Sequence, residues 1–309
     1  MDNWSKYMTK MSNQVIFFGS GPVAAEALSD LLNHFSFEAV ITKPGDSKNP
    51  NLVEALASHH GLKLFLAPNR AALDLLFDNN PFDSQLGILI DYGIIVSPKV
   101  INSFPQGIIN SHFSLLPQWR GADPITFAIL SGQSKTGVSL MLINPELDEG
   151  YLLAQKEYDI QPDLTTPELT QALISLSGEL LCSVVPKYVA GAIKPYPQNS
   201  SLTPTYSRKI TKDDGRIDWR KPAKQIEREI RAYIDWPKSY TLLGSHEVII
   251  TKAKIINSSG EPGTIDLSDK KHLVIYCSDE ALEVLCLKPA GKPLMTAEAF
   301  LAGYRVSLS

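Results

Sequence analysis

Short apolar runs alternate with stretches of helical periodicity along the first half of the chain. The run from Gln14 ends at Gly19, and after Pro22 apolar residues recur at helical spacing through Leu32. This pattern predicts a strand, a tight turn and a helix. Alternating strands and helices predict a parallel sheet with helices on both faces, which binds ligands beyond the carboxyl ends of its strands. Further strands are expected at 38–42, 63–66 and 86–90, helices at 51–60 and 70–79, and site loops at 91–97 and 113–121.

The pattern changes near residue 190. After helices expected at 123–132 and 167–189, residues 191–205 gather prolines with small polar residues, which favours an extended linker. The remainder holds one expected helix at 223–233 and short runs typical of strands, at 239–241, 247–256, 263–266, 273–277 and 281–288. We therefore expect an N-terminal Rossmann-like α/β domain over 1–190, a linker over 191–207 and a small β-barrel domain over 208–309.

Composition indicates a folded, water-soluble chain. Its 309 residues, 44% hydrophobic and 20% charged, suffice for two cores and do not suggest a disordered or fibrous protein. The three cysteines are odd in number and lack zinc-site spacing, which argues against a disulfide framework or a cysteine metal site. No run of about 18 apolar residues is evident and the start MDNWSKYMTKMSN lacks targeting features, so we expect a cytoplasmic protein without a membrane segment. Basic residues exceed acidic ones only beyond residue 202, and slightly, so only that half favours polyanions.

The first turn carries a dinucleotide-like pattern. Residues Gly19 to Ala24 satisfy G-x-G-x-x-A after a strand, the spacing that lets a backbone approach a pyrophosphate. Such a site also needs an acidic residue about 20 positions further on to hold the ribose. The second expected strand instead ends at Thr42 and Lys43, which has the wrong charge. A tight structural turn is therefore the favoured interpretation, and a nicotinamide oxidoreductase is the alternative.

Asn110 and His112 form the sharpest chemical signal in the chain. They follow an apolar pair, and in a strand residues i and i+2 point to one face, so an amide and an imidazole would lie side by side. Donors fixed in this way can hold the oxyanion of a tetrahedral intermediate, which points to acyl transfer. Transfer to an amine also needs a proton acceptor, and Asp148 is the candidate, in a loop after the apolar run 137–143 that we expect at the same edge of the sheet. Singly, an N-x-H pair is more often a core pair and such an aspartate a turn residue, so spacing alone leaves both interpretations open.

The segment from Asn110 to Ile125, with the text NSHFSLLPQWRGADPI, resembles the signature of formyltransferases that use 10-formyltetrahydrofolate. The resemblance extends through 136–141 to 147–150, in the family's order and spacing. It implies that Asn110 and His112 polarise the formyl carbonyl, while Asp148 orients His112 and relays a proton, with direct attack by the substrate amine. It also implies folate-binding residues, namely Ser114, Leu115, Leu116 and Pro117 in one loop and Tyr92, Gly93 and Ile95 along a wall of the pterin pocket.

Residues 206–237 and 287–295 resemble the methionyl-tRNA branch of this family, whose small barrel is OB-like. The resemblance implies formyl transfer to the amino group of methionyl initiator tRNA by a monomer that uses no metal. Basic residues of the second domain are then candidates for tRNA phosphate contacts, namely Arg208, Lys209, Arg216, Arg228 and Arg231.

Two features depart from the family pattern. The loop after the second strand, residues 43–51, is short and has no arginine, so we expect it to add little to tRNA selection, and Lys48 is its test position. Asp123 stands where the family usually has alanine, and Arg120 would either bind an anionic substrate or pin the catalytic loop. The rival hypotheses are a formyltransferase that acts on an amino sugar nucleotide and a non-catalytic RNA-binding protein.

Overall fold

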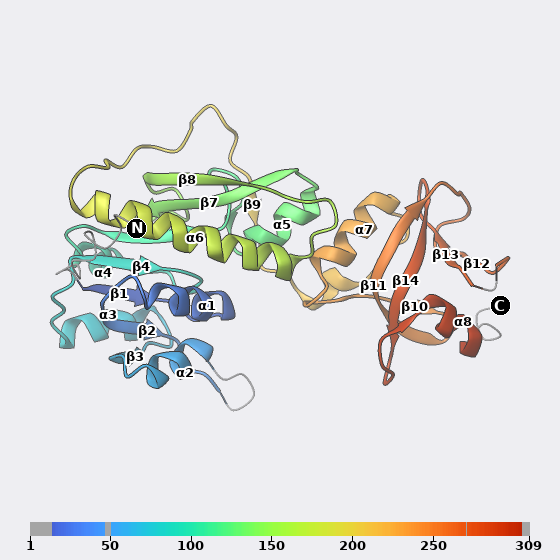
Figure 1. The fold of residues 1–309 in the computed structure, drawn as a ribbon, viewed down its shortest axis with the longest axis horizontal. Helices are drawn as coiled ribbons and strands as arrows, with labels where there is room; N and C mark the ends of the chain where they lie inside the picture. Colours follow the sequence, from blue (N-terminus) through green and yellow to red (C-terminus); the bar gives the residue numbers. More distant parts are fainter. Residues whose placement is uncertain (1–13, 47–50, 270, 305–309) are drawn as a thin grey trace, which may run out of the picture. The chain divides into compact units, whose positions relative to one another are not determined.

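The computed structural model describes residues 14–46, 51–269 and 271–304, and Lys48 lies outside them. Two compact units emerge from the contacts within the chain (Figure 1). The first comprises the chain through Gly121 with 136–159 and 170–206, and the second comprises 122–135, 160–169 and the chain from Ser207. The units interleave along the sequence, and the expected borders near 190 and 207 stay predictions.

A seven-stranded sheet organises the first unit. The order of its strands is β3-β2-β1-β4-β5-β7-β8, in which the pairs among the first five are parallel and β5 pairs antiparallel with β7. The predicted α/β class is confirmed, with an antiparallel extension. The strands are β1 (Val15–Phe18), β2 (Phe37–Thr42), β3 (Leu64–Leu66), β4 (Leu86–Leu89), β5 (Ile108–His112), β7 (Lys135–Leu142) and β8 (Leu152–Asp159).

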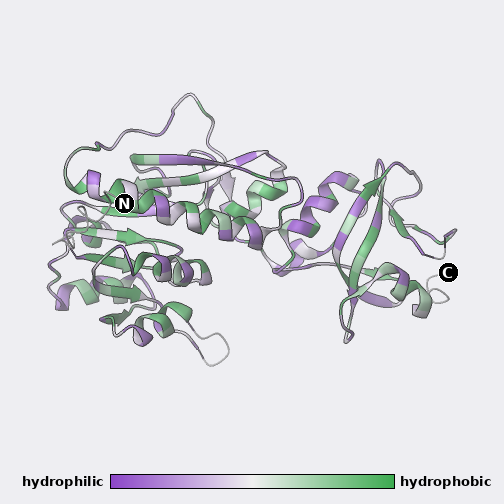
Figure 2. Cartoon of the chain, in the orientation of Figure 1, coloured by the Kyte–Doolittle hydropathy of each residue, from purple (hydrophilic) through white to green (hydrophobic). Residues whose placement is uncertain are grey.

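Helices cover both faces of this sheet, which explains why its inner strands are apolar along their length (Figure 2). Phe18 on β1 and Leu73 on α3 lie in one buried cluster. On another face, the Ser111 hydroxyl of β5 lies 2.7 Å from that of Ser177 on α6. Strands β6 (Arg120–Gly121) and β9 (Tyr206–Ser207) pair to form a separate two-stranded ribbon. The helices are α1 (Pro22–Leu31), α2 (Leu52–His59), α3 (Arg70–Asn79), α4 (Pro98–Asn102) and α6 (Thr166–Val189).

Helix α6 is long and apolar enough to cross a membrane, judged by length and composition only. The sequence analysis looked for an unbroken apolar run and did not select this helix, because Glu168 and Glu179 interrupt it. The core helix of a water-soluble protein passes the same test, and α6 buries Leu169, Leu173 and Leu181 completely. The absence of a membrane segment stays a prediction.

A curled antiparallel sheet organises the second unit, in the order β10-β11-β14-β13-β12 with β15 on β14. It forms a half-barrel that confirms the predicted small barrel domain, and its core includes Leu287 of β14, Ile230 of α7 and Phe300 of α8. The strands are β10 (Ser239–Leu243), β11 (His246–Ile256), β12 (Ile265–Asp266), β13 (Leu273–Tyr276), β14 (Ala281–Pro289) and β15 (Met295–Thr296), and the helices are α5 (Pro124–Ser131), α7 (Ala223–Ala232), α8 (Ala297–Tyr304) and the 3₁₀ turn η2 (Lys212–Gly215).

Candidate active site

Asn110 and His112 project from β5 on the side away from α6. Their neighbour Ser111 bonds the helix, and alternation along a strand turns the residues on either side to the opposite face. Both side chains are nearly buried, with 9% of Asn110 and 6% of His112 exposed. Within the described chain no group bonds the Asn110 amide. The predicted side-by-side placement on one strand face is therefore present, with an amide that a substrate oxygen can use.

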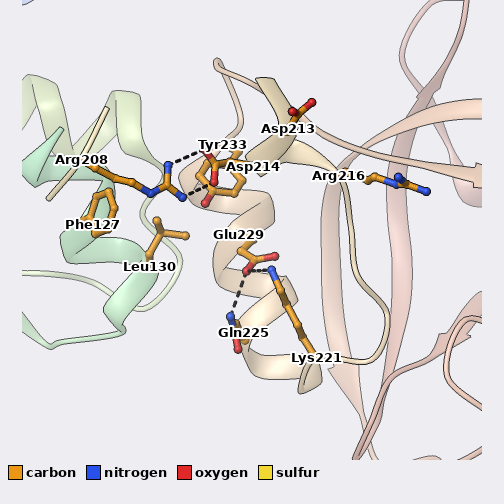
Figure 3. A pocket seen from close by; sticks show the side chains of 10 residues that line it. All are labelled: Phe127, Leu130, Arg208, Asp213, Asp214, Arg216, Lys221, Gln225, Glu229 and Tyr233. Carbon is orange, nitrogen blue, oxygen red and sulfur yellow. Dashed lines mark hydrogen bonds and ion pairs between the residues drawn. The ribbon is translucent and has the colours of Figure 1, made fainter. Parts of the chain in front are cut away.

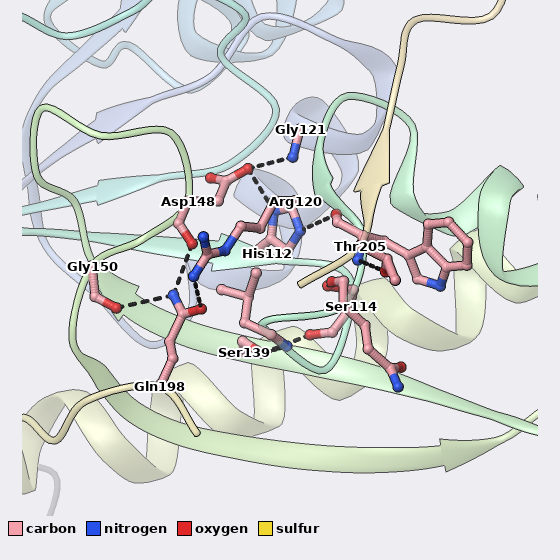
Figure 4. Close-up of polar contacts among 12 residues, drawn as sticks. His112, Ser114, Arg120, Gly121, Ser139, Asp148, Gly150, Gln198 and Thr205 are labelled. Atoms are coloured by element: carbon pink, nitrogen blue, oxygen red, sulfur yellow. Dashed lines mark hydrogen bonds and ion pairs between the residues drawn. The ribbon is translucent and has the colours of Figure 1, made fainter. Parts of the chain in front are cut away.

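The His112 ring lies between a backbone carbonyl and a carboxylate (Figure 4). Its Nε2 is 2.9 Å from the Trp119 carbonyl oxygen, which can only accept, so Nε2 carries the proton in this contact. Its Nδ1 lies 3.7 Å from Asp148 Oδ2, too far for a direct hydrogen bond but within the distance of an electrostatic contact. The Gly121 amide donates to the same carboxylate oxygen at 2.7 Å. The carboxylate is therefore held in place beside the imidazole.

The route by which Asp148 reaches His112 differs from the sequence argument. Because β7 runs antiparallel to β5, with Leu142 opposite Ile109, the loop after β7 leaves the sheet at the end of β5 remote from His112. The expectation of a shared carboxyl edge was wrong, since an apolar run does not reveal strand direction. The loop returns through Asp148, whose φ of 54° is left-handed. At Gly150 a Cβ would lie 1.7 Å from the Leu142 carbonyl, so only glycine fits against the end of β7.

The loop from Ser114 to Pro117 is held by hydrogen bonds to side chains of β7 and β8. Ser139 of β7 donates to the Ser114 carbonyl at 2.6 Å and accepts from the Leu116 amide at 3.0 Å. Gln155 of β8 donates to the Leu116 carbonyl at 2.9 Å. Ser114, Leu116 and Pro117 are buried, whereas Leu115 is half-buried. A folate contact by this loop stays a prediction.

Tyr92, Gly93 and Ile95 occupy different environments. Tyr92 is 1% exposed and packs edge-on against Phe18, with ring centroids 5.7 Å apart. The Gly93 carbonyl accepts from Lys43 Nζ at 2.8 Å. Ile95 is 69% exposed. The three residues selected from the sequence are therefore a core aromatic, a loop glycine whose carbonyl is hydrogen-bonded, and an exposed side chain. Their role in a pterin pocket stays a prediction.

The dinucleotide-like turn is closed by its own fold. The amide of Gly19 donates to Ile41, and those of Ser20 and Gly21 donate to the Asp91 carbonyl, at 3.0 to 3.3 Å. A Cβ on Gly21 would lie 1.8 Å from an Asp91 carboxylate oxygen, so a negative charge stands at the start of α1. These amides are not free for a pyrophosphate, and the carboxylate would repel one. The geometry opposes the nicotinamide alternative.

Three more residues contact the loops of this site, and of these only Arg120 had been given a role from the sequence. Arg120 is 8% exposed and donates to Glu149 Oε1 at 2.6 Å and to Gln198 Oε1 at 2.8 Å. Arg120 was expected either to bind an anionic substrate or to pin the catalytic loop, and these contacts favour the second role. Gln198 donates to the carbonyls of Asp148 and Gly150, and Thr205 accepts from the Trp119 amide. Gln198 and Thr205 lie in the proline-rich segment, whose composition carries no signal for such contacts.

A hollow lies within the second unit, with a volume of about 360 Å³ (Figure 3). Arg208 and Asp214 line it and form a two-bond ion pair, while Lys221 donates to the buried Glu229 at 2.7 Å. Arg228 donates to the Ser131 carbonyl, and Arg231 pairs with Glu227. Among the predicted phosphate contacts, only Lys209 and Arg216 have side chains with no partner in the described chain.

Fold and site together define a two-domain group-transfer enzyme, with an amide, an imidazole and a carboxylate beside β5. The chain belongs to the formyl transferase family: residues 15–185 match the formyl transferase domain and 209–305 match its C-terminal domain. The resemblance predicted from the sequence is thereby confirmed. Within the described residues no cluster of three metal-ligand side chains occurs, and the prediction of a metal-free enzyme stays open to test.

Two relatives of nearly the same length are both named methionyl-tRNA formyltransferase. A methionyl-tRNA formyltransferase of Myxococcus xanthus is 33% identical and covers 95% of this chain and 96% of its own. That of Chloroflexus aurantiacus is 35% identical and covers 94% and 96%. Among solved structures, an N-formyltransferase from Helicobacter canadensis in complex with folinic acid and dTDP-3-aminofucose has a TM-score of 0.67 at 20% identity and covers 88% of this chain and 98% of its own. HypX from Aquifex aeolicus in complex with tetrahydrofolic acid has a TM-score of 0.63 at 15% identity and covers 94% and 47%. The two solved structures share the fold.

Proposed function

We propose that this enzyme transfers the formyl group of 10-formyltetrahydrofolate to the amino group of methionyl initiator tRNA. Similarity to methionyl-tRNA formyltransferases over nearly the whole chain, second unit included, carries the proposal. The amino-sugar alternative rests on more distant relatives, at 20% identity. A non-catalytic RNA-binding protein is disfavoured because Asn110, His112 and Asp148 remain together beside β5.

The side chains beside β5 suit this reaction. The methionine nitrogen attacks the formyl carbon, the new C–N bond forms, and the bond from that carbon to the folate nitrogen breaks. Asn110 donates to the formyl oxygen as it becomes negative, and His112 beside it helps to polarise the formyl carbonyl. Asp148 accepts the proton that the attacking amine must lose, and a water molecule relays it to the departing folate nitrogen. The loops at 92–95 and 114–117 hold the folate.

The second unit supplies sequence-independent phosphate contacts, for which Lys209 and Arg216 are the available side chains. We further propose that the protein is a monomer in the cytoplasm, where it meets its tRNA substrate. Sedimentation of the pure chain tests the monomer.

A comparison of acceptors tests the function. The protein is incubated with 10-formyltetrahydrofolate and either methionyl initiator tRNA or an amino-sugar nucleotide, and each product is analysed by mass. A gain of one formyl group on methionyl-tRNA alone is expected. Formylation of the sugar nucleotide alone would overturn the proposal, and the absence of any formylated product would favour the non-catalytic alternative.

A further inference from the structure

We call residues 191–206 the strap. The strap carries no catalytic group itself, but it hydrogen-bonds to the loop of Asp148 and to the loop whose Trp119 carbonyl contacts His112. Midway along the strap, the Gln198 side-chain amide donates to the carbonyls of Asp148 at 2.7 Å and Gly150 at 3.2 Å. Near its C-terminal end, Thr205 Oγ1 accepts from the Trp119 amide at 2.9 Å, and the Thr205 carbonyl accepts from the Arg120 amide at 2.9 Å. The strap therefore contacts the backbone on both sides of the His112 and Asp148 pair (Figure 4).

The bonded residues hold conformations that need external support. Asp148 and Trp119 both have a φ of 54°, in the left-handed region that side chains other than glycine seldom adopt. Trp119 is also the residue whose carbonyl accepts from His112 Nε2. A bond at the Trp119 amide thus fixes the acceptor that orients the imidazole, while a bond at the Asp148 carbonyl fixes the carboxylate that faces it.

Gln198 is chemically specific in this position. Its amide nitrogen donates to two carbonyls while its amide oxygen accepts from Arg120, whose other terminal nitrogen holds Glu149. A glutamate of the same shape could keep the bond from Arg120. It would place a negative oxygen against both carbonyls, and the loop would be pushed away.

We propose that Gln198 and Thr205 are positioning residues, which set the geometry between His112 and Asp148 through the backbone of the two loops. The inference rests on the proposed formyl transfer. A displacement of about 1 Å between reacting groups can lower a rate by about 100-fold, so loss of either contact acts on turnover.

The test compares Gln198→Glu with Asn199→Asp, a change that adds the same charge one residue further on. Asn199 is exposed, and aspartate keeps the oxygen that accepts from the Ser201 amide and hydroxyl. Gln198→Glu is expected to lower kcat for methionyl-tRNA formylation by about 10-fold to 100-fold, with the KM values for both substrates within about twofold. Asn199→Asp is expected to match the wild type.

A second pair probes the other end. Thr205→Val removes the acceptor oxygen and is expected to lower kcat, whereas Thr205→Ser keeps the hydroxyl and is expected to restore it. A wild-type kcat in both Gln198→Glu and Thr205→Val would overturn the inference, as would a parallel rise in both KM values without a change in kcat. A wild-type protein with no formylation activity would refute the proposed function instead, so the two failures are distinguishable. Thermal unfolding midpoints of all variants identify one that fails to fold, in which case the other pair decides.

Discussion

The Asn110 amide is a single donor whose removal breaks no internal network. It has 9% of its surface exposed and no partner in the described chain. Asn110→Ala is therefore expected to leave the unfolding midpoint nearly unchanged while it lowers kcat by about 10² to 10³, the usual cost of one lost oxyanion donor. Steady-state kinetics against methionyl initiator tRNA measure this loss, with Asn102→Ala on the exposed face of α4 as control. A kcat within twofold of the wild type would remove Asn110 from the mechanism.

A second residue-scale prediction concerns pH and the pair of Arg208 with Asp214. The Arg208 guanidinium and the hydrogen bonds from Thr211 hold the pKa of the Asp214 carboxyl well below its ordinary value of 3.8. A carboxyl with a depressed pKa in the folded state stabilises the fold fully above its unfolded pKa, and this contribution is lost as the pH falls toward the folded value. Between pH 5 and pH 3 the wild type should thus lose more stability than Asp214→Asn.

Urea unfolding of the two proteins at pH 5, 4 and 3 measures the difference. Asp213→Asn is the matched control, because Asp213 is exposed, adjacent and outside that ion pair. The linkage is refuted if Asp214→Asn and the wild type lose stability in parallel, or if Asp213→Asn flattens the pH dependence equally.

The sequence made Asn110, His112 and Asp148 identifiable, whereas Gln198 and Thr205 had no signal. The first three carry chemistry in their side chains, and their text resembles a known signature. The other two act by bonding backbone groups that lie 50 and 86 positions away along the chain. Any polar side chain on an extended segment can do this, so only coordinates reveal which one does. Period-two alternation along a strand predicted that Asn110 and His112 share one face. The path by which Asp148 reaches them depends on the direction of β7, which the sequence did not show.

At the scale of elements, Asn51 joins the start of α2 to the end of β2. Its side-chain oxygen accepts from the amides of Val53 and Glu54, and its nitrogen donates to the Lys43 carbonyl and to the buried Thr42 hydroxyl. Asn51→Ala should lower the free energy of unfolding by about 2 kcal/mol, at the upper end for a helix cap, because it also leaves a buried hydroxyl unpaired. Asn51→Asp keeps the cap and loses only the donor, so a smaller loss is expected.

Chemical denaturation measures these changes, with Asn79→Ala at the exposed end of α3 as control. An Asn51→Ala loss no larger than that of the control would contradict the capping role.

Elements with strong periodicity were predicted close to their observed bounds, and weakly patterned ones were not. Helices α1, α3 and α7 bury one apolar face each, which period 3.6 reveals. Strand β8 was missed because its sequence LLAQKEYD is polar beyond the first residues, as suits a strand at the edge of the sheet. The short ribbon of β6 and β9 was also missed, since two-residue strands are defined by their partner and not by a pattern.

At the scale of the molecule, each of the two units has a large buried cluster of its own. One holds Phe18, Leu73 and Val100 in the first unit, and the other holds Leu287, Ile230 and Phe300 in the second. Composition and length predicted two cores, and the change of texture near residue 190 separated an α/β half from a strand-rich half. Texture could not show that 122–135 and 160–169 belong to the second unit, because helical sequence looks alike in either core.

Because each unit has its own core, a substitution that destabilises one core should lower the local stability of that unit mainly. Phe300 is fully buried on α8, and truncation of such a ring to alanine removes about 3–5 kcal/mol through lost burial and a residual cavity. Phe300→Ala should therefore speed hydrogen exchange at amides of β11, β13 and β14, which enclose that cluster, while amides of β1 and β4 keep their protection. The exposed Leu294→Ala is the control and should leave both sets unchanged. Equal loss of protection in β1 and β14 would mean that the two cores unfold as one cooperative unit, and the division of the chain into two independently stabilised halves would be wrong.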